Sequence, residues 1–154
     1  MNAPARNANP ADSANVKDGT NSTDLVCRFW CDEKLRNADT DRQGHINNAV
    51  MGSFFEAGRI EILDAPQIGE IRRSHAIVVA RVTIDYLQEL FYPGQVRVGT
   101  NVTRVGTSSM TFEQHLVGPR GLAARAESIC VLIDRQTRRP SPIPQAMRDW
   151  LMGT

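Results

Sequence analysis

Residues 38–49 read ADTDRQGHINNA, and residues 50–65 continue directly as VMGSFFEAGRIEILDA. The first segment is polar and contains a glycine, which is typical of a tight loop. In the second segment apolar residues recur three and four positions apart, which predicts a helix from about Asn48 to Ala65. The apolar stripe is broad, so we expect the helix to be largely buried. Pro66 follows and ends it.

Strand patterns lie on both sides of this helix. Residues 25–36, rich in Val, Phe and Trp, predict a first strand before it. After the helix, alternating apolar residues separated by glycine-containing turns predict four more strands, at 77–87, 95–105, about 110–116 and 122–134. Within 77–87, every second residue from Val78 to Tyr86 is expected to share one face. A short helix is predicted at 144–151.

These elements together predict the fold class. One antiparallel five-stranded sheet wrapped around one long helix accounts for the order of elements, which makes the fold α+β. The chain has 154 residues, the usual size of a single domain. Its formal net charge is only +1, which argues against nucleic-acid binding through bulk charge. The sequence contains no apolar run of the ~18 residues that a membrane span needs.

The first 23 residues differ from the rest in composition. They are rich in Asn and Ala and almost lack large apolar side chains, so we predict a disordered tail at 1–23 and a folded domain at 24–154. They also lack the apolar stretch of a signal peptide. The three cysteines show no spacing typical of disulfides or zinc ligands. Free thiols in the reducing cytoplasm are therefore expected.

The loop before the helix carries the side chains most able to do chemistry. A helix N-terminus offers unpaired N–H groups and the positive end of the helix dipole, so it attracts an oxygen that is becoming an anion. Asp41, on a tight loop with Gly44, can face the same point, which makes a minimal acyl-transfer site. In the alternative interpretation, Asp39 or Asp41 caps a turn, and Asn47 or Asn48 only caps the helix.

Segment 38–49 resembles the signature loop of hotdog-fold acyl-CoA thioesterases of the 4-hydroxybenzoyl-CoA thioesterase type. That loop reads roughly Asp-Thr-Asp-x-x-Gly-His-Val-Asn-Asn and leads into the central helix. FFEAGRIE at 54–61 is similar to the family's Tyr-Phe-Glu-x-Ala-Arg-x-Glu stretch, and segments 79–87 and 103–111 also fit. The resemblance covers about residues 25–135 and implies the hotdog fold.

The resemblance implies hydrolysis of an acyl-CoA thioester to CoA and a free acid. Water is the second substrate, and no metal or other cofactor is implied. Asp41 matches the catalytic carboxylate, acting as nucleophile or as general base. The backbone N–H of Asn48 matches the oxyanion donor, Gly44 allows close backbone approach, and His45 lines the loop. Asp39 is expected to be structural.

The resemblance also implies a homodimer or homotetramer whose active site lies at the subunit interface. Met51 stands where the family often has Tyr, near the acyl pocket, so the acyl group itself is left open. The candidate substrate-binding residues are Asn47, Met51, Phe55, Ser108, Ser109 and Arg104.

The sequence leaves open two other functions and one other catalytic residue. His45 with Asp41 could imitate a hotdog dehydratase that acts on hydroxyacyl thioesters. A non-catalytic acyl-CoA binder is the second rival. Glu56 lies inside the helix, where another hotdog thioesterase lineage carries its catalytic carboxylate. The structural interpretation of Glu56 is an ion pair with Arg59, three residues on.

Overall fold

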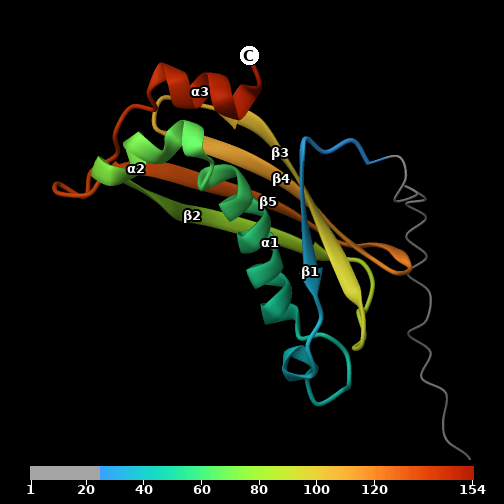
Figure 1. The fold of residues 1–154 in the computed structure, drawn as a ribbon. Helices are drawn as coiled ribbons and strands as arrows, with labels where there is room; N and C mark the ends of the chain where they lie inside the picture. Colours follow the sequence, from blue (N-terminus) through green and yellow to red (C-terminus); the bar gives the residue numbers. More distant parts are fainter. Residues whose placement is uncertain (1–24) are drawn as a thin grey trace, which may run out of the picture.

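The computed structural model describes residues 25–154, which form an antiparallel sheet curved around one long helix (Figure 1). The sheet has five strands in the order β1-β3-β4-β5-β2. The strands are β1 (Phe29–Lys34), β2 (His75–Tyr86), β3 (Gln95–Val105), β4 (Ser109–Gly118) and β5 (Gly121–Asp134). The helices are α1 (Asn48–Leu63), α2 (Gly69–Ser74) and α3 (Gln145–Met152), with short 3-10 turns η1 (Asn37–Asp39) and η2 (Pro66–Ile68). This is the predicted α+β hotdog architecture.

The predicted elements are confirmed with small changes at their ends. β3 has the predicted bounds, and α1 begins where predicted and ends two residues earlier, at Leu63. β1 is shorter than predicted because the chain turns into η1 after Leu35, whose N–H donates to the carbonyl of Gly94. The sequence analysis did not predict α2, η1 or η2. The tail predicted at 1–23 lies outside the described residues.

Two expectations about the whole chain can be checked only on the described part. No helix in residues 25–154 is long and apolar enough to cross a membrane. The cysteines Cys27, Cys31 and Cys130 are all free, as their spacing predicted.

Local interactions explain where α1 begins and how closely it approaches the sheet. The Asn47 side chain caps it by accepting a hydrogen bond from the Ala49 N–H at 2.9 Å. Gly58 sits directly on the sheet, since a Cβ there would lie 2.7 Å from Val98 Cγ1 and 2.9 Å from Thr100 Oγ1. Close packing thus accounts for a glycine that costs about 1 kcal/mol of helix propensity relative to alanine.

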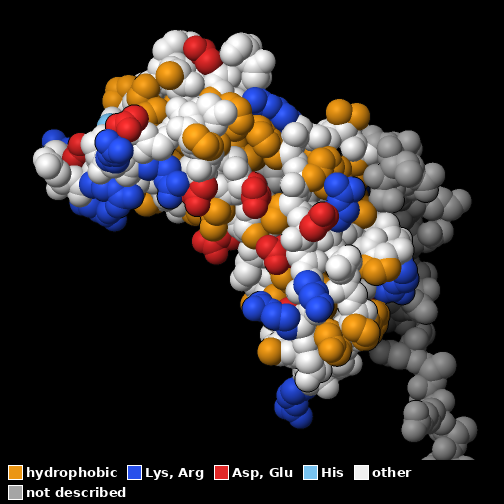
Figure 2. All heavy atoms as spheres, in the orientation of Figure 1, with side chains coloured by type: hydrophobic (Ala, Val, Ile, Leu, Met, Phe, Trp, Pro, Cys, Tyr) orange, Lys and Arg blue, Asp and Glu red, His pale blue; other side chains and the backbone are white. Residues whose placement is uncertain are grey.

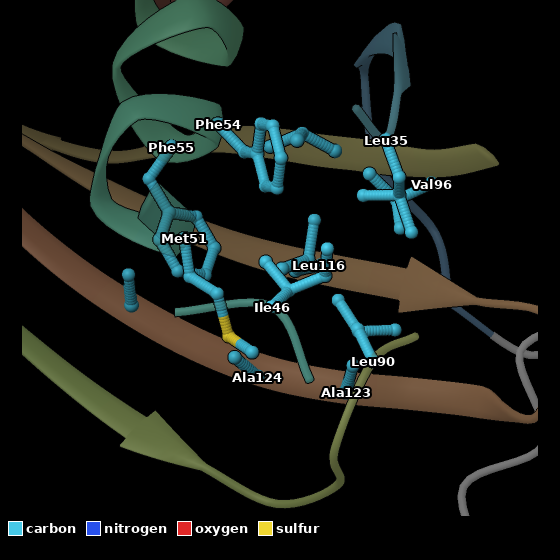
Figure 3. Close-up of a cluster of buried hydrophobic side chains, with 12 residues drawn as sticks. Leu35, Ile46, Met51, Phe54, Phe55, Leu90, Val96, Leu116, Ala123 and Ala124 are labelled. Carbon is cyan, nitrogen blue, oxygen red and sulfur yellow. The ribbon is translucent and has the colours of Figure 1, made fainter. Parts of the chain in front are cut away.

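Two hydrophobic clusters lie between the sheet and the helices. The loop-end cluster, drawn in Figure 3, lies under the first half of α1. The C-terminal cluster lies under the second half of α1 and is covered by α3, which packs against η2 and β3. The loop-end cluster comprises Leu35, Ile46, Met51, Phe54, Phe55, Leu90, Val96, Val98, Leu116, Ala123, Ala124 and Ala126. The C-terminal cluster comprises Ile62, Ile68, Met110, Phe112, Cys130, Leu132, Ile143, Met147 and Leu151.

A buried polar layer separates the two clusters. Arg59 Nη1 donates to Gln114 Oε1 and to Ser128 Oγ, both at 2.9 Å. Gln114 Nε2 in turn donates to the Phe55 carbonyl at 2.8 Å and to Thr100 Oγ1 at 3.0 Å. Arg59, Gln114 and Ser128 each sit between a member of one cluster and a member of the other along their own element. The layer therefore fixes α1 on the middle of the sheet.

The expected ion pair between Glu56 and Arg59 is wrong. Arg59 turns inward to the polar layer and is buried, whereas Glu56 is exposed on α1. Burial lowers the pKa of the Arg59 guanidinium, whose two hydrogen-bond acceptors are neutral. Glu56 remains an accessible carboxylate on the helix.

The free edge strand β2 differs from its predicted pattern. The register against β5 shifts between Val79 and Arg81, which inserts one extra residue. Val79 pairs with Cys130, Ile84 pairs with Ala126, and both partners are buried under α1. Since paired residues point to the same face, the bulge reverses the alternation. The prediction that Val78 shares a face with Ile84 is therefore wrong.

Candidate active site

The loop before α1 is held tightly by its own backbone. The Asp41 N–H donates to the His45 carbonyl at 2.9 Å, and the Gly44 N–H donates to the Asp41 carbonyl at 3.1 Å. Gly44 has φ +86°, a left-handed conformation that side chains with a Cβ adopt at a cost. Gly44 therefore lets the loop close and brings His45 back over Asp41.

The Asp41 carboxylate is oriented at both oxygens and still reaches solvent. Its Oδ1 accepts from the Gln43 N–H at 2.8 Å, and its Oδ2 lies 3.1 Å from His45 Nδ1. The other ring nitrogen of His45 lies 2.7 Å from Gln43 Oε1 and 3.8 Å from Glu89 Oε1. The Asp41 side chain is 26% exposed, so it is positioned and accessible together.

Asp39 has the structural environment that the sequence predicted. It is buried and accepts hydrogen bonds from the Arg36 backbone N–H at 2.8 Å and from the Arg36 guanidinium. Burial by itself raises the pKa of Asp39, but the hydrogen bonds from Arg36 outweigh it and the pKa is lowered. Its carbonyl also accepts from the Asn47 N–H at 2.9 Å, which ties the loop to the start of α1.

The N-terminus of α1 lies beside the Asp41 carboxylate. Asn47 caps the Ala49 N–H, while the Asn48 N–H belongs to the first helical turn, where N–H groups have no intrahelical acceptor. Tyr86, at the end of β2, donates from its hydroxyl to the Asn48 carbonyl at 3.1 Å. The end of the edge strand is thereby joined to the start of the helix.

Two adjoining hollows meet at this point. The first is lined by Thr40, Asp41, Arg42, Gln43, His45, Asn47 and Asn48. The second is lined by Gln43, His45, Ile46, Asn48, Met51, Tyr86, Leu87, Gln88 and Glu89. They share Gln43, His45 and Asn48 and together make one groove, which we call the loop groove. Its polar half faces the carboxylate, and its other half reaches the apolar residues Ile46 and Met51.

Most of the predicted site residues converge on the loop groove, and four do not. Asp41, Gly44, His45, Asn47, Asn48 and Met51 lie on or along it. Phe55 has no exposed surface and packs inside the loop-end cluster. Ser108, Ser109 and Arg104 lie toward the opposite end of the sheet, because Lys34 beside the loop pairs with Gln95, nine residues before Arg104 on β3. Nine strand residues span about 30 Å.

That opposite end of the sheet is rich in arginine. Figure 2 shows blue side chains gathered over α2 and the loop after β5. The Arg135 N–H donates to the Ser74 carbonyl, which joins the two segments. The arginines of these segments are Arg72, Arg73, Arg135, Arg138 and Arg139.

Sequence reasoning missed the residues that β2 and the following loop bring to the groove. Tyr86, Gln88 and Glu89 all line it. They are 45 to 48 positions from Asp41, and nothing in their local pattern separates them from other strand-end residues. Only the pairing of β2 with β5 carries them to the start of α1.

Comparison with known proteins identifies the family. A family model described as the thioesterase-like superfamily matches residues 35–151. The chain belongs to the thioesterase-like superfamily. The match includes the whole loop groove and four of the five strands, all but β1.

Two curated relatives match most of the chain. The acyl-CoA thioester hydrolase YbgC of Escherichia coli is 25% identical over 113 residues, which cover 71% of this chain and 84% of that protein. The 1,4-dihydroxy-2-naphthoyl-CoA hydrolase of Synechococcus elongatus is 24% identical over 125 residues, 78% of this chain and 92% of that protein.

Solved structures agree with the family and the fold. A predicted thioesterase from Bacillus stearothermophilus has a TM-score of 0.73 and 33% identity, covering 80% of this chain and 92% of its own. A Thermus thermophilus thioesterase, solved with coenzyme A and Zn, has a TM-score of 0.74 and 29% identity, covering 82% of this chain and 98% of its own. The chain is thus a hotdog-fold thioesterase.

Proposed function

We propose that this thioesterase hydrolyses acyl-CoA thioesters, with Asp41 as the catalytic carboxylate and the Asn48 N–H as the oxyanion donor. One observation carries the proposal: the Asp41 carboxylate and the N-terminus of α1 line the same groove. The acyl-CoA substrate is supported by the similarity to YbgC and to the Synechococcus hydrolase, both of which act on CoA esters by name.

The groove supports a simple reaction sequence. The thioester carbonyl oxygen lies at the Asn48 N–H, where the helix dipole stabilises the negative charge that develops on it. Asp41 either attacks the carbonyl carbon or removes a proton from the attacking water. In the first case an acyl-aspartyl anhydride forms and water then cleaves it; in both cases the C–S bond breaks and the CoA thiolate takes a proton. Water is the only co-substrate.

His45 is a positioning residue in this proposal. Its Nδ1 lies 3.1 Å from Asp41 Oδ2, and its Nε2 faces Gln43 and Glu89, so the ring orients the carboxylate. The same contact supports the rival function, because a hydroxyacyl-thioester dehydratase pairs a His with a carboxylate. Incubation with a 3-hydroxyacyl-CoA separates the two: the thioesterase releases thiol, and a dehydratase forms an enoyl-CoA.

We further propose that two copies of the chain pair along their β2 edges. Val79, Val82 and Tyr86 project to the helix side of this free edge and are 50%, 40% and 45% exposed. An unpaired edge strand with apolar residues is a template for pairing. Antiparallel pairing around a two-fold axis brings the His75 end of one β2 beside the Tyr86 end of the other.

This pairing supplies what one chain lacks at its groove. Arg104 pairs with Thr111 and Ser109 pairs with Val131, on the face of the sheet opposite the buried Met110 and Cys130, so these two side chains point away from α1. In the proposed dimer it is the arginine-rich end of the partner subunit, described above, that approaches the loop groove. Arginines recognise phosphate, so this end fits the phosphates of CoA. Val82→Asp is expected to give a monomer by light scattering with most of the activity lost. An active monomer would contradict the shared site.

Thiol release from a panel of acyl-CoAs tests the proposed function. Asp41→Asn is expected to lower the rate by about 10²–10⁴-fold, the usual contribution of a positioned acid–base group. Glu56→Gln is the matched control, since it removes an exposed carboxylate from α1 and is expected to keep the rate. Full activity of Asp41→Asn together with an inactive Glu56→Gln would assign catalysis to Glu56. The absence of release with every ester would contradict the proposed function.

A further inference from the structure

Met51 lies between the hydrophobic core and the loop groove. It is only 1% exposed, yet its side chain lines the loop groove. It lies three residues after Asn48 on α1, so the two share one face of the helix, about 4.5 Å apart along the axis. Any acyl group whose carbonyl sits at the Asn48 N–H therefore extends toward Met51.

The space beneath Met51 is built from small and aliphatic groups. In Figure 3 the Met51 thioether points from α1 toward Ala124 on β5, with Ile46 and Leu116 nearby. Ala123, Ala124 and Ala126 give this part of the sheet short side chains, and the unbranched Met51 fills the space over them. Methionine has three rotatable side-chain bonds and adapts its shape easily.

The loop-end cluster around Met51 consists of apolar side chains. The polar layer begins one helical turn beyond Phe55, with Arg59 and Gln114. An apolar chain that displaced the Met51 thioether would thus contact the side chains of this cluster before it reached that layer. The depth between the groove and the polar layer limits the chain length that can enter.

We propose that Met51 is the movable floor of the acyl subsite and sets the length of the acyl group. Compact acyl groups occupy the groove above it, and longer linear chains are excluded unless the thioether moves aside. The inference rests on the proposed acyl-CoA hydrolase function for its ligand. Met51→Ala removes three side-chain atoms and is expected to extend the preferred chain by about three carbons.

Binding of S-alkyl-CoA thioethers tests the inference independently of turnover, because the thioether bond is not hydrolysed. Calorimetry with butyl to dodecyl chains is expected to show tighter binding of long chains to Met51→Ala than to the natural protein. The gain is at least about tenfold, since each buried methylene contributes about fourfold. Met51→Phe, with a rigid ring, is expected to shift the preference to shorter chains. If Met51→Ala does not fold, the Met51→Phe variant still tests the inference.

Met147→Ala is the matched control. Met147 is equally buried, but it lies in the C-terminal cluster under α3, so its loss is expected to leave the chain-length profile unchanged. Identical profiles for the natural protein, Met51→Ala and Met51→Phe would overturn the inference. Thiol release with unchanged profiles would leave the proposed function standing and remove the role of Met51. A shifted binding profile without thiol release from any ester would leave the role of Met51 standing and contradict the proposed function.

Discussion

The two hydrophobic clusters under α1 are made of the same layers but are covered differently. Over the C-terminal cluster α3 packs against the sheet, and Trp150 Nε1 donates to the Ile62 carbonyl at 3.3 Å. Over the loop-end cluster lies the polar loop 40–46, with the groove between them. One end of the helix–sheet interface is therefore closed by a helix, and the other is open to a ligand. The proposed active site therefore lies at the end of the core that α3 does not cover.

The largest expected difference between the two clusters is the unfolding free energy lost when a buried side chain is shortened. Met147→Ala is expected to lower the free energy of unfolding by about 3 kcal/mol, because α3 seals the space left behind. Met51→Ala is expected to cost about half as much, since the space opens to the groove and admits water. Urea unfolding of both variants measures the difference. Equal losses of unfolding free energy would mean that the space around Met51 is closed to water as tightly as the space around Met147.

The segment of α1 at the polar layer is expected to tolerate added side-chain volume least. Gly58→Ala is expected to destabilise by about 2 kcal/mol, because the new methyl group meets Val98 and Thr100 and overpacking outweighs the gain in helix propensity. Gly52→Ala on the same helix meets nothing within 4 Å and is expected to stabilise by about 0.5–1 kcal/mol. Thermal unfolding of the two variants measures both. A stabilising Gly58→Ala would contradict the close contact.

The cap at the loop end is expected to matter to both stability and activity. Asn47→Ala removes the hydrogen bond to the Ala49 N–H and is expected to cost about 1 kcal/mol, with slower thiol release as the first turn of α1 frays. Asn48→Ala keeps its backbone N–H and is expected to be near neutral in both assays. If Asn48→Ala alone abolished activity, the side chain and not the backbone would be the donor.

The smallest expected effect concerns acid stability. The folded-state pKa of Asp39 is lowered below its ordinary 3.8, so its pairing with Arg36 stabilises the fold above about that pH and is lost as the pH falls through the folded pKa. Arg36→Ala is expected to lower the free energy of unfolding slightly at neutral pH, because the pair is exposed on the Arg36 side, and the difference should vanish in acid. Arg72→Ala, which breaks an exposed pair with Asp64 at the other end, is the control. A difference that persisted in acid would rule out Asp39 as the cause.

The candidate site was predictable where its parts are neighbours in the chain. Asp41, Gly44 and Asn48 lie within eight residues, so turn geometry and the start of a helix bring them together without help from the rest of the fold. Met51 follows on the same helical face. Phe55, four residues after Met51, is a predicted substrate-binding residue, yet it has no exposed surface.

The parts that pattern analysis missed depend on pairing between distant segments. The bulge between Val79 and Arg81 reverses the faces of β2, and alternation alone cannot reveal an extra residue. Arg59 was expected to pair with Glu56, one turn away, but the neutral acceptors Gln114 and Ser128 on two strands draw it inward.

The sequence by itself determined the order of elements, the long buried helix and the carboxylate loop at its start, because local periodicity and turn chemistry act over a few residues. Only the tertiary structure decided that Tyr86 meets the Asn48 carbonyl and that an arginine separates two apolar clusters. It also decided that Met51 lines the loop groove. These features arise where segments tens of residues apart pack together, and packing depends on the volumes and registers of all of them at once.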